Sequence, residues 1–383
     1  MTTQTIGKIF NRSFIIAFFA QFAMLSVFYL LIPTLPIYLS RLGSNEVEIG
    51  ILIGIFMLSS VALRPFVGRA LLKISEKTFM IGGALLLAFT SAAYLFALPF
   101  WPFLIVRLFQ GIGFAFFHTA SMTLIANISP EAHRGQSFSY FSLASNIAGA
   151  LAPPLGIFFI NHFSFTFLFL ICSGLSLCSL FITHQLESRK VVTQEDSSNV
   201  SSSFLSRNVL PPSIVHSFSF FIWGALTAFF PLYAIHNGVT NPGIFYTTIA
   251  VMLVLGRSLG GKIFDLYRKE RIILPCLTTF ILSMLILAFS KTLPMFILVA
   301  VVWGIGFTFL SPSLIAYILD RAGTPSGPAM GTFTAISDLG LTLGPMIMGI
   351  VIHSTSYRIM FLCLALMGFI NLNYFYFFVR RKV

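Results

Sequence analysis

Three ionisable residues lie inside long apolar stretches of the sequence. Arg107 belongs to VRLFQGIGFAFF (residues 106–117), whereas the similar stretch VAVVWGIGFTFL (299–310) has Ala300 at the matching position. Asp338 is the only one of the eleven acidic residues that lies well inside an apolar segment, and His118 follows the first of the two stretches directly. Histidine titrates near neutral pH, and burial favours the protonated form of a carboxyl group. These side chains therefore have the chemistry to carry protons through an apolar medium.

Each of these residues also has a simpler explanation. A guanidinium in hydrocarbon costs from about 3 to more than 10 kcal/mol, so Arg107 must face a cavity, meet a partner or extend along its helix towards the outer surface. A residue needed for packing would recur in both stretches, and the alanine at 300 favours a functional arginine. Asp338 could instead be a protonated side chain that donates a hydrogen bond to a neighbouring helix. We predict a proton-coupling set of Arg107, Asp338 and His118, without a direct Arg107–Asp338 ion pair.

The composition indicates the elements that hold these residues. Hydrophobic residues make up 57% of the chain and charged residues 9%, compared with about 25% charged residues in soluble proteins. Runs of about twenty apolar residues are long enough to cross a bilayer, where helices satisfy their own backbone groups. We predict an all-α polytopic membrane protein with twelve transmembrane helices. The predicted spans are 14–39, 48–68, 78–98, 102–127, 137–160, 164–184, 212–235, 243–264, 273–290, 294–319, 330–352 and 357–378.

The distribution of charge predicts the orientation. With the N-terminus in the cytoplasm, 19 of the 23 Lys and Arg residues lie at or near the cytoplasmic face, as expected for a protein of the cytoplasmic (inner) membrane. Both termini are then cytoplasmic, and the net charge of +12 needs no nucleic-acid partner. We interpret the first span as a retained helix and not as a signal peptide. No metal or cofactor is expected, because the four cysteines fall inside spans without a metal-ligand spacing; they are Cys172, Cys178, Cys276 and Cys363.

The two halves of the chain repeat one pattern. A serine-rich, charged segment at 186–211 predicts a cytoplasmic linker between an N-terminal six-helix bundle (1–185) and a C-terminal one (212–383). The segments RPFVGRALLKISEK (64–77) and RSLGGKIFDLYRKE (257–270) align at an offset of 193 residues. Two more pairs align at 192 and near 195: FSLASNIAGALAPPLG (141–156) with FTAISDLGLTLGPMIM (333–348), and PIYLSRLG (36–43) with PLYAIHNG (231–238). We therefore predict two pseudo-symmetric bundles.

These features resemble the major facilitator superfamily over essentially the whole chain. The loop after the second span is similar to the family's Gly-x-x-x-Asp-Arg-x-Gly-Arg-Lys motif from Gly68 and Arg69 onwards, although Leu72 replaces the aspartate. The second half retains the acid as Asp265, after Gly261. The fourth span matches the family's Arg-x-x-Gln-Gly-x-Gly pattern with residues 107–113. In the family this arginine takes part in proton coupling, and the resemblance implies the same here.

A second motif concerns the fifth and eleventh spans. GALAPPLG (149–156) is similar to the Gly-x-x-x-Gly-Pro motif of antiporters through Gly149 and Pro153, with Ala152 at the second glycine. The full form, GLTLGP (340–345), includes Gly344 and Pro345 in the eleventh span. Proline breaks the helical hydrogen-bond ladder and can kink a helix. Kinks there could form part of a rocking surface, although packing alone would also explain these residues.

The resemblance also implies a central cavity lined by the first, fourth, seventh and tenth spans. Mapped onto this sequence, the polar or aromatic residues of those spans are Gln21, Tyr29, Gln110, His216, Trp223, Trp303 and Ser311. This lining has few charges and many aromatic groups, which favours a hydrophobic or amphiphilic organic solute. For both tryptophans, packing against lipid or in the core is the competing explanation.

The predicted function is proton-coupled export of a small organic solute by a monomeric carrier whose partners are the solute, protons and the bilayer. An importer of a sugar, amino acid or other nutrient is the first alternative, because Ala152 departs from the antiporter motif. A membrane receptor that does not transport is the second. An enzyme is not expected, since the sequence has no HExxH or GxSxG, and the P-loop-like GRSLGGKI (256–263) has isoleucine where the metal-binding hydroxyl belongs.

Overall fold

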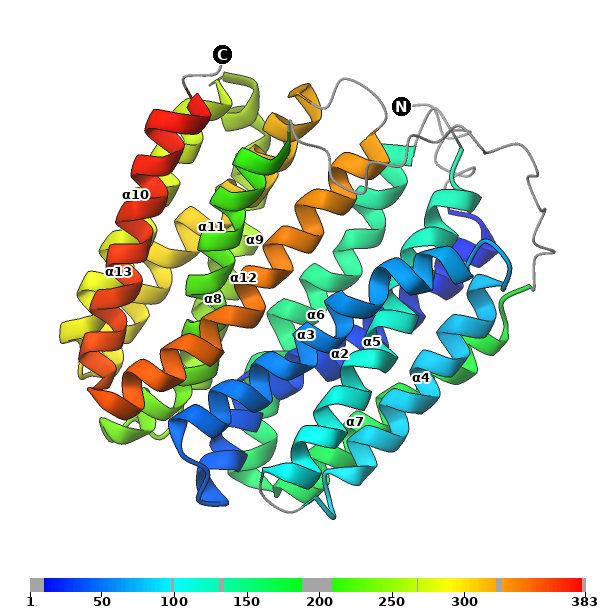
Figure 1. Ribbon diagram of the computed structural model, residues 1–383, viewed down its shortest axis with the longest axis horizontal. Helices are drawn as coiled ribbons and strands as arrows, with labels where there is room; N and C mark the ends of the chain where they lie inside the picture. Colours follow the sequence, from blue (N-terminus) through cyan, green and yellow to red (C-terminus); the bar gives the residue numbers. More distant parts are fainter. Residues whose placement is uncertain are drawn as a thin grey trace. The chain divides into compact units, whose positions relative to one another are not determined.

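The computed structural model describes residues 10–97, 100–130, 134–187, 209–266, 268–321 and 326–380, with the backbone alone at 134–135, 257–266, 319–321 and 326–331. This part of the chain forms twelve α-helices and a short π-helix, without a strand (Figure 1). The helices are α2 Arg12–Arg41, α3 Glu46–Ala70, α4 Glu76–Ala93, α5 Trp101–Ile128, α6 Arg134–His162, α7 Phe165–His184, α8 Leu210–His236, α9 Gly243–Leu266, α10 Lys269–Phe289, α11 Leu293–Arg321, α12 Ser326–Ser354 and α13 Tyr357–Tyr374, followed by η3 Phe375–Val379.

The twelve predicted helices are confirmed, and within the described residues ten are long and apolar enough to cross a membrane. The other two are α4, which begins with the charged residues Glu76 and Lys77, and α9, whose described apolar stretch covers Gly243–Gly256. The third predicted span, 78–98, was too long at its end. The helix stops at Ala93, where Leu95 and Phe96 donate their backbone N–H groups to the carbonyls three residues before them and close a turn. Most of the predicted linker, from 188 to 208, lies outside the described residues.

The helices belong to two compact units. Unit 1 comprises Met1–Leu35 and Leu58–Val200, and unit 2 comprises Pro36–Met57 and Ser201–Val383. In unit 1, α4 packs against α5 and α7, and α6 packs against α5 and α7. In unit 2, α8 packs along α12, α10 along α11 and α13, and α9 along α11 (Figure 1). Each unit is therefore a helical bundle with its own packed core.

Glycine permits the closest helix approaches in both units. In unit 1, a Cβ added to Gly83 of α4 would lie 2.6 Å from the carbonyl oxygen of Gly113 in α5. In unit 2, a Cβ on Gly224 of α8 would lie 2.6 Å from the carbonyl oxygen of Leu341, and one on Gly344 of α12 would overlap the carbonyl oxygen of Phe221. The second glycine of GLTLGP thus brings the α12 backbone directly against α8.

Replacing Gly344 by alanine should destabilise unit 2. The added methyl would meet the backbone oxygen of Phe221, which cannot rotate away, and overpacking of this kind costs about 1–3 kcal/mol. Gly82→Ala on α4 is the matched control, since a Cβ there meets nothing within 4 Å and alanine is the better helix former. Thermal unfolding in detergent should show a lower midpoint for Gly344→Ala and no loss for Gly82→Ala. Equal midpoints for the two variants would contradict this packing.

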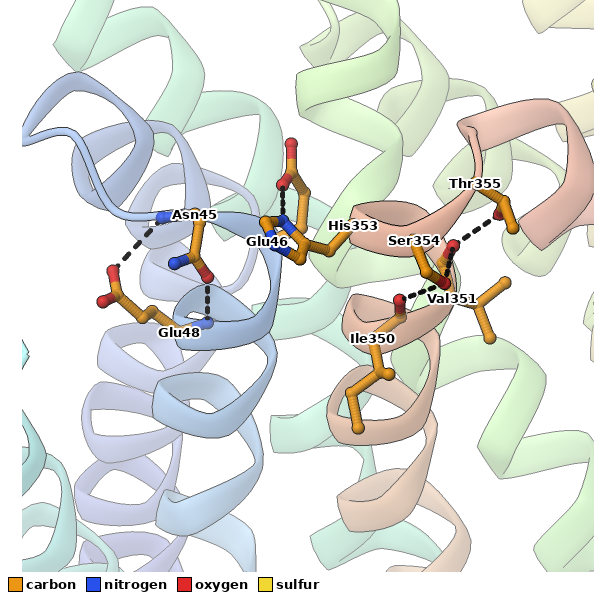
Figure 2. Close-up of polar contacts among 8 residues, drawn as sticks. All are labelled: Asn45, Glu46, Glu48, Ile350, Val351, His353, Ser354 and Thr355. Carbon is orange, nitrogen blue, oxygen red and sulfur yellow. Dashed lines mark hydrogen bonds and ion pairs between the residues drawn. The ribbon is translucent and has the colours of Figure 1, made fainter.

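The start of α3 packs against the end of α12 within unit 2. Asn45 and Glu48 cap α3 reciprocally: the Glu48 N–H donates to Asn45 Oδ1 over 2.9 Å, and the Asn45 N–H donates to Glu48 Oε2 over 3.2 Å (Figure 2). His353 Nδ1 lies 3.4 Å from Glu46 Oε2. Gly349 has no side chain to separate α12 from the backbone of Glu46. The His353–Glu46 pair is largely exposed, so it is expected to stabilise the fold by only about 0–1 kcal/mol.

The structure repeats as the sequence does. Gly43 follows α2 with φ +88°, and Gly238 follows α8 with φ +77°. At the offset of 195 residues these positions are equivalent, and so are the last residues of the two helices, Arg41 and His236. A left-handed glycine after the last turn is a common helix C-terminus. The first helix of each half therefore ends in the same way.

Candidate functional site

His118 links the first and fourth helices of unit 1. The Gln21 side-chain amide on α2 donates from Nε2 to His118 Nδ1 on α5 over 2.8 Å. Ser121, one turn further along α5, lies with its Oγ 2.8 Å from Gln21 Oε1 and 2.9 Å from the His118 carbonyl oxygen. Gln21 is 1% exposed and the His118 ring is partly buried, stacked on Phe114. We call Gln21, His118 and Ser121 the first histidine clamp.

Arg107 is buried in unit 1 and takes part in a second polar group. Its side chain is 5% exposed, and Nη1 donates to Gln110 Oε1 over 2.8 Å. Tyr94, just after α4, donates its hydroxyl to the same oxygen and stacks on Phe103. The guanidinium is therefore held inside the bundle, where it meets a partner, and does not extend along its helix to the surface. Gln110, predicted to contact solute, here fixes Arg107 and Tyr94.

His216 links three helices of unit 2. Its Nδ1 lies 2.7 Å from Ser337 Oγ on α12, and its Nε2 lies 3.0 Å from Ser311 Oγ on α11. Ser337 donates its own proton to the Phe333 carbonyl over 2.6 Å. The His216 side chain is 4% exposed and lies against Phe220 and Phe333. We call His216, Ser311 and Ser337 the second histidine clamp. Both ring nitrogens of His216 have a hydrogen-bond partner in it.

Four aromatic rings lie nearly parallel in unit 2. Trp303 on α11 stacks on Phe280 at 4.1 Å and lies 5.8 Å from Trp223 on α8, which in turn stacks on Phe307 at 5.0 Å. Trp303 is fully buried, and within the described residues its Nε1 has no hydrogen-bond partner. Trp223 is partly exposed. Of the two predicted cavity tryptophans, only Trp223 has a surface that a solute could reach in this structure.

Tyr29 and the antiporter-like motif of α6 meet in unit 1. The Tyr29 hydroxyl lies 3.2 Å from Ser145 Oγ. A Cβ on Gly149 would lie 3.2 Å from the Tyr29 ring, so this glycine makes room for the tyrosine. Pro153 is buried inside α6, as Pro345 is inside α12. The motif residues of α6 and α12 therefore pack against the first helix of their own half.

Asp338 lies on α12, one residue after the serine of the second histidine clamp. Its side chain is partly buried, and its carbonyl accepts the Thr342 hydroxyl over 2.8 Å. Arg107 and His118 belong to unit 1 and Asp338 to unit 2. The predicted proton-coupling residues are thus divided between the two units.

The remaining motif residues lie near helix ends. Gly68 and Arg69 are exposed in the last turn of α3, with open space where a Cβ of Gly68 would stand. Gly261 and Asp265 belong to the end of α9, and their side chains lie outside the described residues. In the part of the chain that the structure describes, no group of three or more His, Cys, Asp or Glu residues is placed to hold a metal.

Sequence reasoning missed Ser121, Ser337 and Tyr94. The repeat did relate the Gln21–His118 contact to the His216–Ser311 contact. An offset of 195 residues maps Gln21 onto His216, and an offset of 193 maps His118 onto Ser311. The same offsets map the ring pair Phe28–Phe114, 5.3 Å apart, onto Trp223–Phe307. Equivalent positions of the two halves therefore form equivalent contacts between their first and fourth helices.

The sequence profile of the Major Facilitator Superfamily matches residues 17–327 of the chain. The chain belongs to the Major Facilitator Superfamily. It is similar to the staphylopine export protein of Staphylococcus aureus (strain Mu50 / ATCC 700699), with 24% identity over 364 residues, covering 90% of this chain and 89% of that protein. It is also 24% identical over 357 residues to the quinolone resistance protein NorA of Staphylococcus aureus (strain COL), covering 88% and 89%. The solved structure of the nucleoside transporter NupG superposes with a TM-score of 0.73 at 16% identity, covering 95% of this chain and 99% of that one.

Membership of the Major Facilitator Superfamily fixes the fold and the broad activity. This superfamily member is a multi-pass membrane protein whose described residues are all-α, with twelve helices in two pseudo-symmetric six-helix bundles. It is a transporter of small-molecule solutes and not an enzyme. The prediction of a transporter is confirmed, and the receptor alternative is set aside.

Proposed function

We propose that this transporter exports a small hydrophobic or amphiphilic organic solute across the cytoplasmic membrane in exchange for protons. The observation that carries the proposal is Asp338, a partly buried carboxyl in the middle of an apolar helix. Such a group must be neutralised by a partner or a proton, and reversible protonation gives the carrier a place to hold a transported proton. The two named Staphylococcus relatives are an export protein and a drug-resistance protein, which supports export as the direction.

In this proposal the residues divide into three groups. Asp338, His118 and Arg107 respond to protons, and solute contacts come from partly exposed groups such as Trp223 and Tyr29. The motif residues of α3, α6, α9 and α12 serve the change of conformation. The two bundles that exchange access would be residues 1–185 and 212–383, joined by the 186–211 segment, in a monomer with both termini in the cytoplasm.

Inside-out membrane vesicles test the direction of transport. Vesicles containing the protein, acidified inside, should take up one or more members of a panel that includes a quinolone, staphylopine, a lipophilic dye, a sugar and an amino acid. Uptake should stop when nigericin abolishes the pH gradient. Vesicles without the protein are the control. Uptake into right-side-out vesicles with inward proton movement would instead show an importer, and overturn the proposal.

A further inference from the structure

The two histidine clamps occupy equivalent positions but hold their histidines on opposite helices. In unit 1 the ring is on the fourth helix of the half (His118) and its partner on the first (Gln21). In unit 2 the ring is on the first helix (His216) and one partner on the fourth (Ser311). Because the same pair of positions is used, differences in proton chemistry between the clamps come from the partner side chains and from the groups that surround each ring.

The hydrogen bonds assign a tautomer to each ring. The Gln21 Nε2 group can only donate, so His118 Nδ1 accepts and the neutral ring carries its proton on Nε2. A serine hydroxyl has one proton, and Ser337 gives its proton to the Phe333 carbonyl, so His216 Nδ1 must donate to Ser337 Oγ. His216 Nε2 then accepts the Ser311 hydroxyl. The two rings hold opposite tautomers.

The first clamp can accept a proton and keep every hydrogen bond. If the Gln21 amide turns over, a protonated His118 Nδ1 donates to Gln21 Oε1, and Gln21 Nε2 donates to Ser121 Oγ. The Ser121 hydroxyl then donates to the His118 carbonyl, which already lies 2.9 Å away. In the neutral state two donors meet two acceptors, and in the protonated state three donors meet three acceptors. Since an unsatisfied buried donor is costly, this double placement of Ser121 removes the hydrogen-bond part of the penalty for charging the ring.

The second clamp has no second acceptor already in place. A proton added to His216 Nε2 would turn Ser311 Oγ into an acceptor, and Ser311 would have to rotate its own proton towards a carbonyl of α11, to which it makes no hydrogen bond in the described residues. His216 as a whole residue is also 4% exposed, whereas His118 is intermediate in exposure. The clamp therefore suits a fixed link among α8, α11 and α12.

The charged and titratable neighbours differ between the clamps. The cation whose field reaches His118 is Arg64 of α3. Arg107 of α5 and Glu76 of α4 are bonded elsewhere, to Gln110 and Asn127. On α6, which packs against α5, the titratable residues with described side chains are Tyr140 and His162. On the helices packed against α8, the titratable or charged residues with described side chains are Tyr317 of α11, Asp338 and His353 of α12, and Tyr357, Arg358, Cys363 and Tyr374 of α13. Tyr317 donates to the Val379 carbonyl.

We propose that Gln21 and Ser121 are positioning residues that let His118 take up and release a proton without losing a hydrogen bond, and that His216 is its non-exchanging structural counterpart. The use of this proton in transport rests on the proposed function above. The exchange itself does not, because it depends only on contacts within unit 1.

Nitrogen NMR of the wild-type protein in lipid nanodiscs, labelled with ring-¹⁵N histidine, tests the proposal without any solute. His118→Gln and His216→Gln identify the two signals. Near neutral pH we expect the Nε2–H tautomer for His118 and the Nδ1–H tautomer for His216, and on acidification His118 should gain its second proton at the higher pH. The same tautomer on both rings, or earlier protonation of His216, would overturn the proposal even if export is demonstrated.

Two sets of variants separate positioning from packing. Ser121→Ala should reduce the protonated fraction of His118 at a given pH by about tenfold, the equivalent of one lost hydrogen bond, whereas the matched Ser311→Ala should leave His118 unchanged. The double exchange Gln21→His with His118→Gln copies the arrangement of unit 2 and should unfold at a higher temperature than Gln21→Ala or His118→Ala. An unchanged His118 titration in Ser121→Ala would show that Ser121 serves packing alone.

Discussion

Asp338→Asn is expected to abolish solute accumulation driven by a pH gradient while leaving solute counterflow intact. Asparagine has nearly the same shape and can hydrogen bond, but it cannot take up a proton. A carrier that exchanges one proton for one neutral solute should accumulate solute about tenfold for each unit of pH gradient, since one unit corresponds to 1.36 kcal/mol. In the variant this ratio should fall to about one. Proteoliposomes loaded with a solute identified in the vesicle assay provide both measurements.

The control for Asp338→Asn is a neighbouring polar residue on the same helix. Thr342→Val removes a hydroxyl whose hydrogen bond, among the described residues, is to the Asp338 backbone carbonyl, and should retain gradient-driven accumulation. If Asp338→Asn accumulates solute as the wild type does, Asp338 is a structural residue and the proton carrier lies elsewhere. If accumulation and counterflow fail together, the variant has lost solute binding or folding, and the assigned role is also wrong.

Arg107→Ala is expected to lower proton-driven transport by about ten- to a hundredfold and to affect counterflow less. The guanidinium is buried and shares Gln110 Oε1 with the Tyr94 hydroxyl, so its removal leaves Tyr94 and Gln110 paired and the bundle intact. Hydrogen bonds to charged groups contribute about 1.5–3 kcal/mol, which sets the scale of the loss. Initial rates with and without a pH gradient, in the same vesicles, measure the difference.

Arg107→Lys distinguishes the explanations for the buried arginine. Lysine keeps the charge but lacks the planar fork that meets Gln110. If charge alone matters, the lysine variant should retain gradient-driven transport, and if the Gln110 geometry matters it should resemble Arg107→Ala. A purely structural arginine would instead lower the unfolding temperature and reduce both transport modes in parallel. That outcome would contradict a role in proton coupling.

The architecture could be predicted from the sequence because hydropathy and repetition are strong signals. Apolar runs of about twenty residues marked the helices, and the offsets near 193 residues related GIGF in α5 to GIGF in α11. The error at the end of α4 arose because the residues of the turn, Tyr94–Ala97, are as apolar as the helix. Hydropathy measures burial and does not detect where backbone hydrogen bonding changes.

The site could be predicted only in part. Gln21, His118, His216 and Ser311 were identified as polar residues in apolar helices, but their pairing was not. Ser121 and Ser337 gave no signal, because serines within apolar helices usually bond to the carbonyl three or four residues earlier, as Ser26 and Ser176 do here. Which serines also reach a side chain on another helix depends on helix rotation, and rotation comes from tertiary packing.

Equivalent positions of the two halves carry different side chains and form different kinds of contact. The repeat supplies two similar contacts between first and fourth helices, but the side chains at other aligned positions differ. At the offset of 193 residues Arg107 aligns with Ala300, and Gln110 aligns with Trp303. In unit 1, Arg107 and Gln110 form a polar group with Tyr94, whereas in unit 2 Trp303 stacks on Phe280. We infer that proton chemistry at this level belongs to the first half and aromatic packing to the second.

Proton movement during solute transport tests the central claim most directly. Purified protein is reconstituted in liposomes that contain a pH-sensitive dye and a transported solute, and the internal pH reported by the dye is recorded together with solute release. The account predicts that protons enter as solute leaves, and that Asp338→Asn abolishes this proton entry. Solute and protons moving in the same direction, or solute release with no proton movement in the wild type, would contradict it.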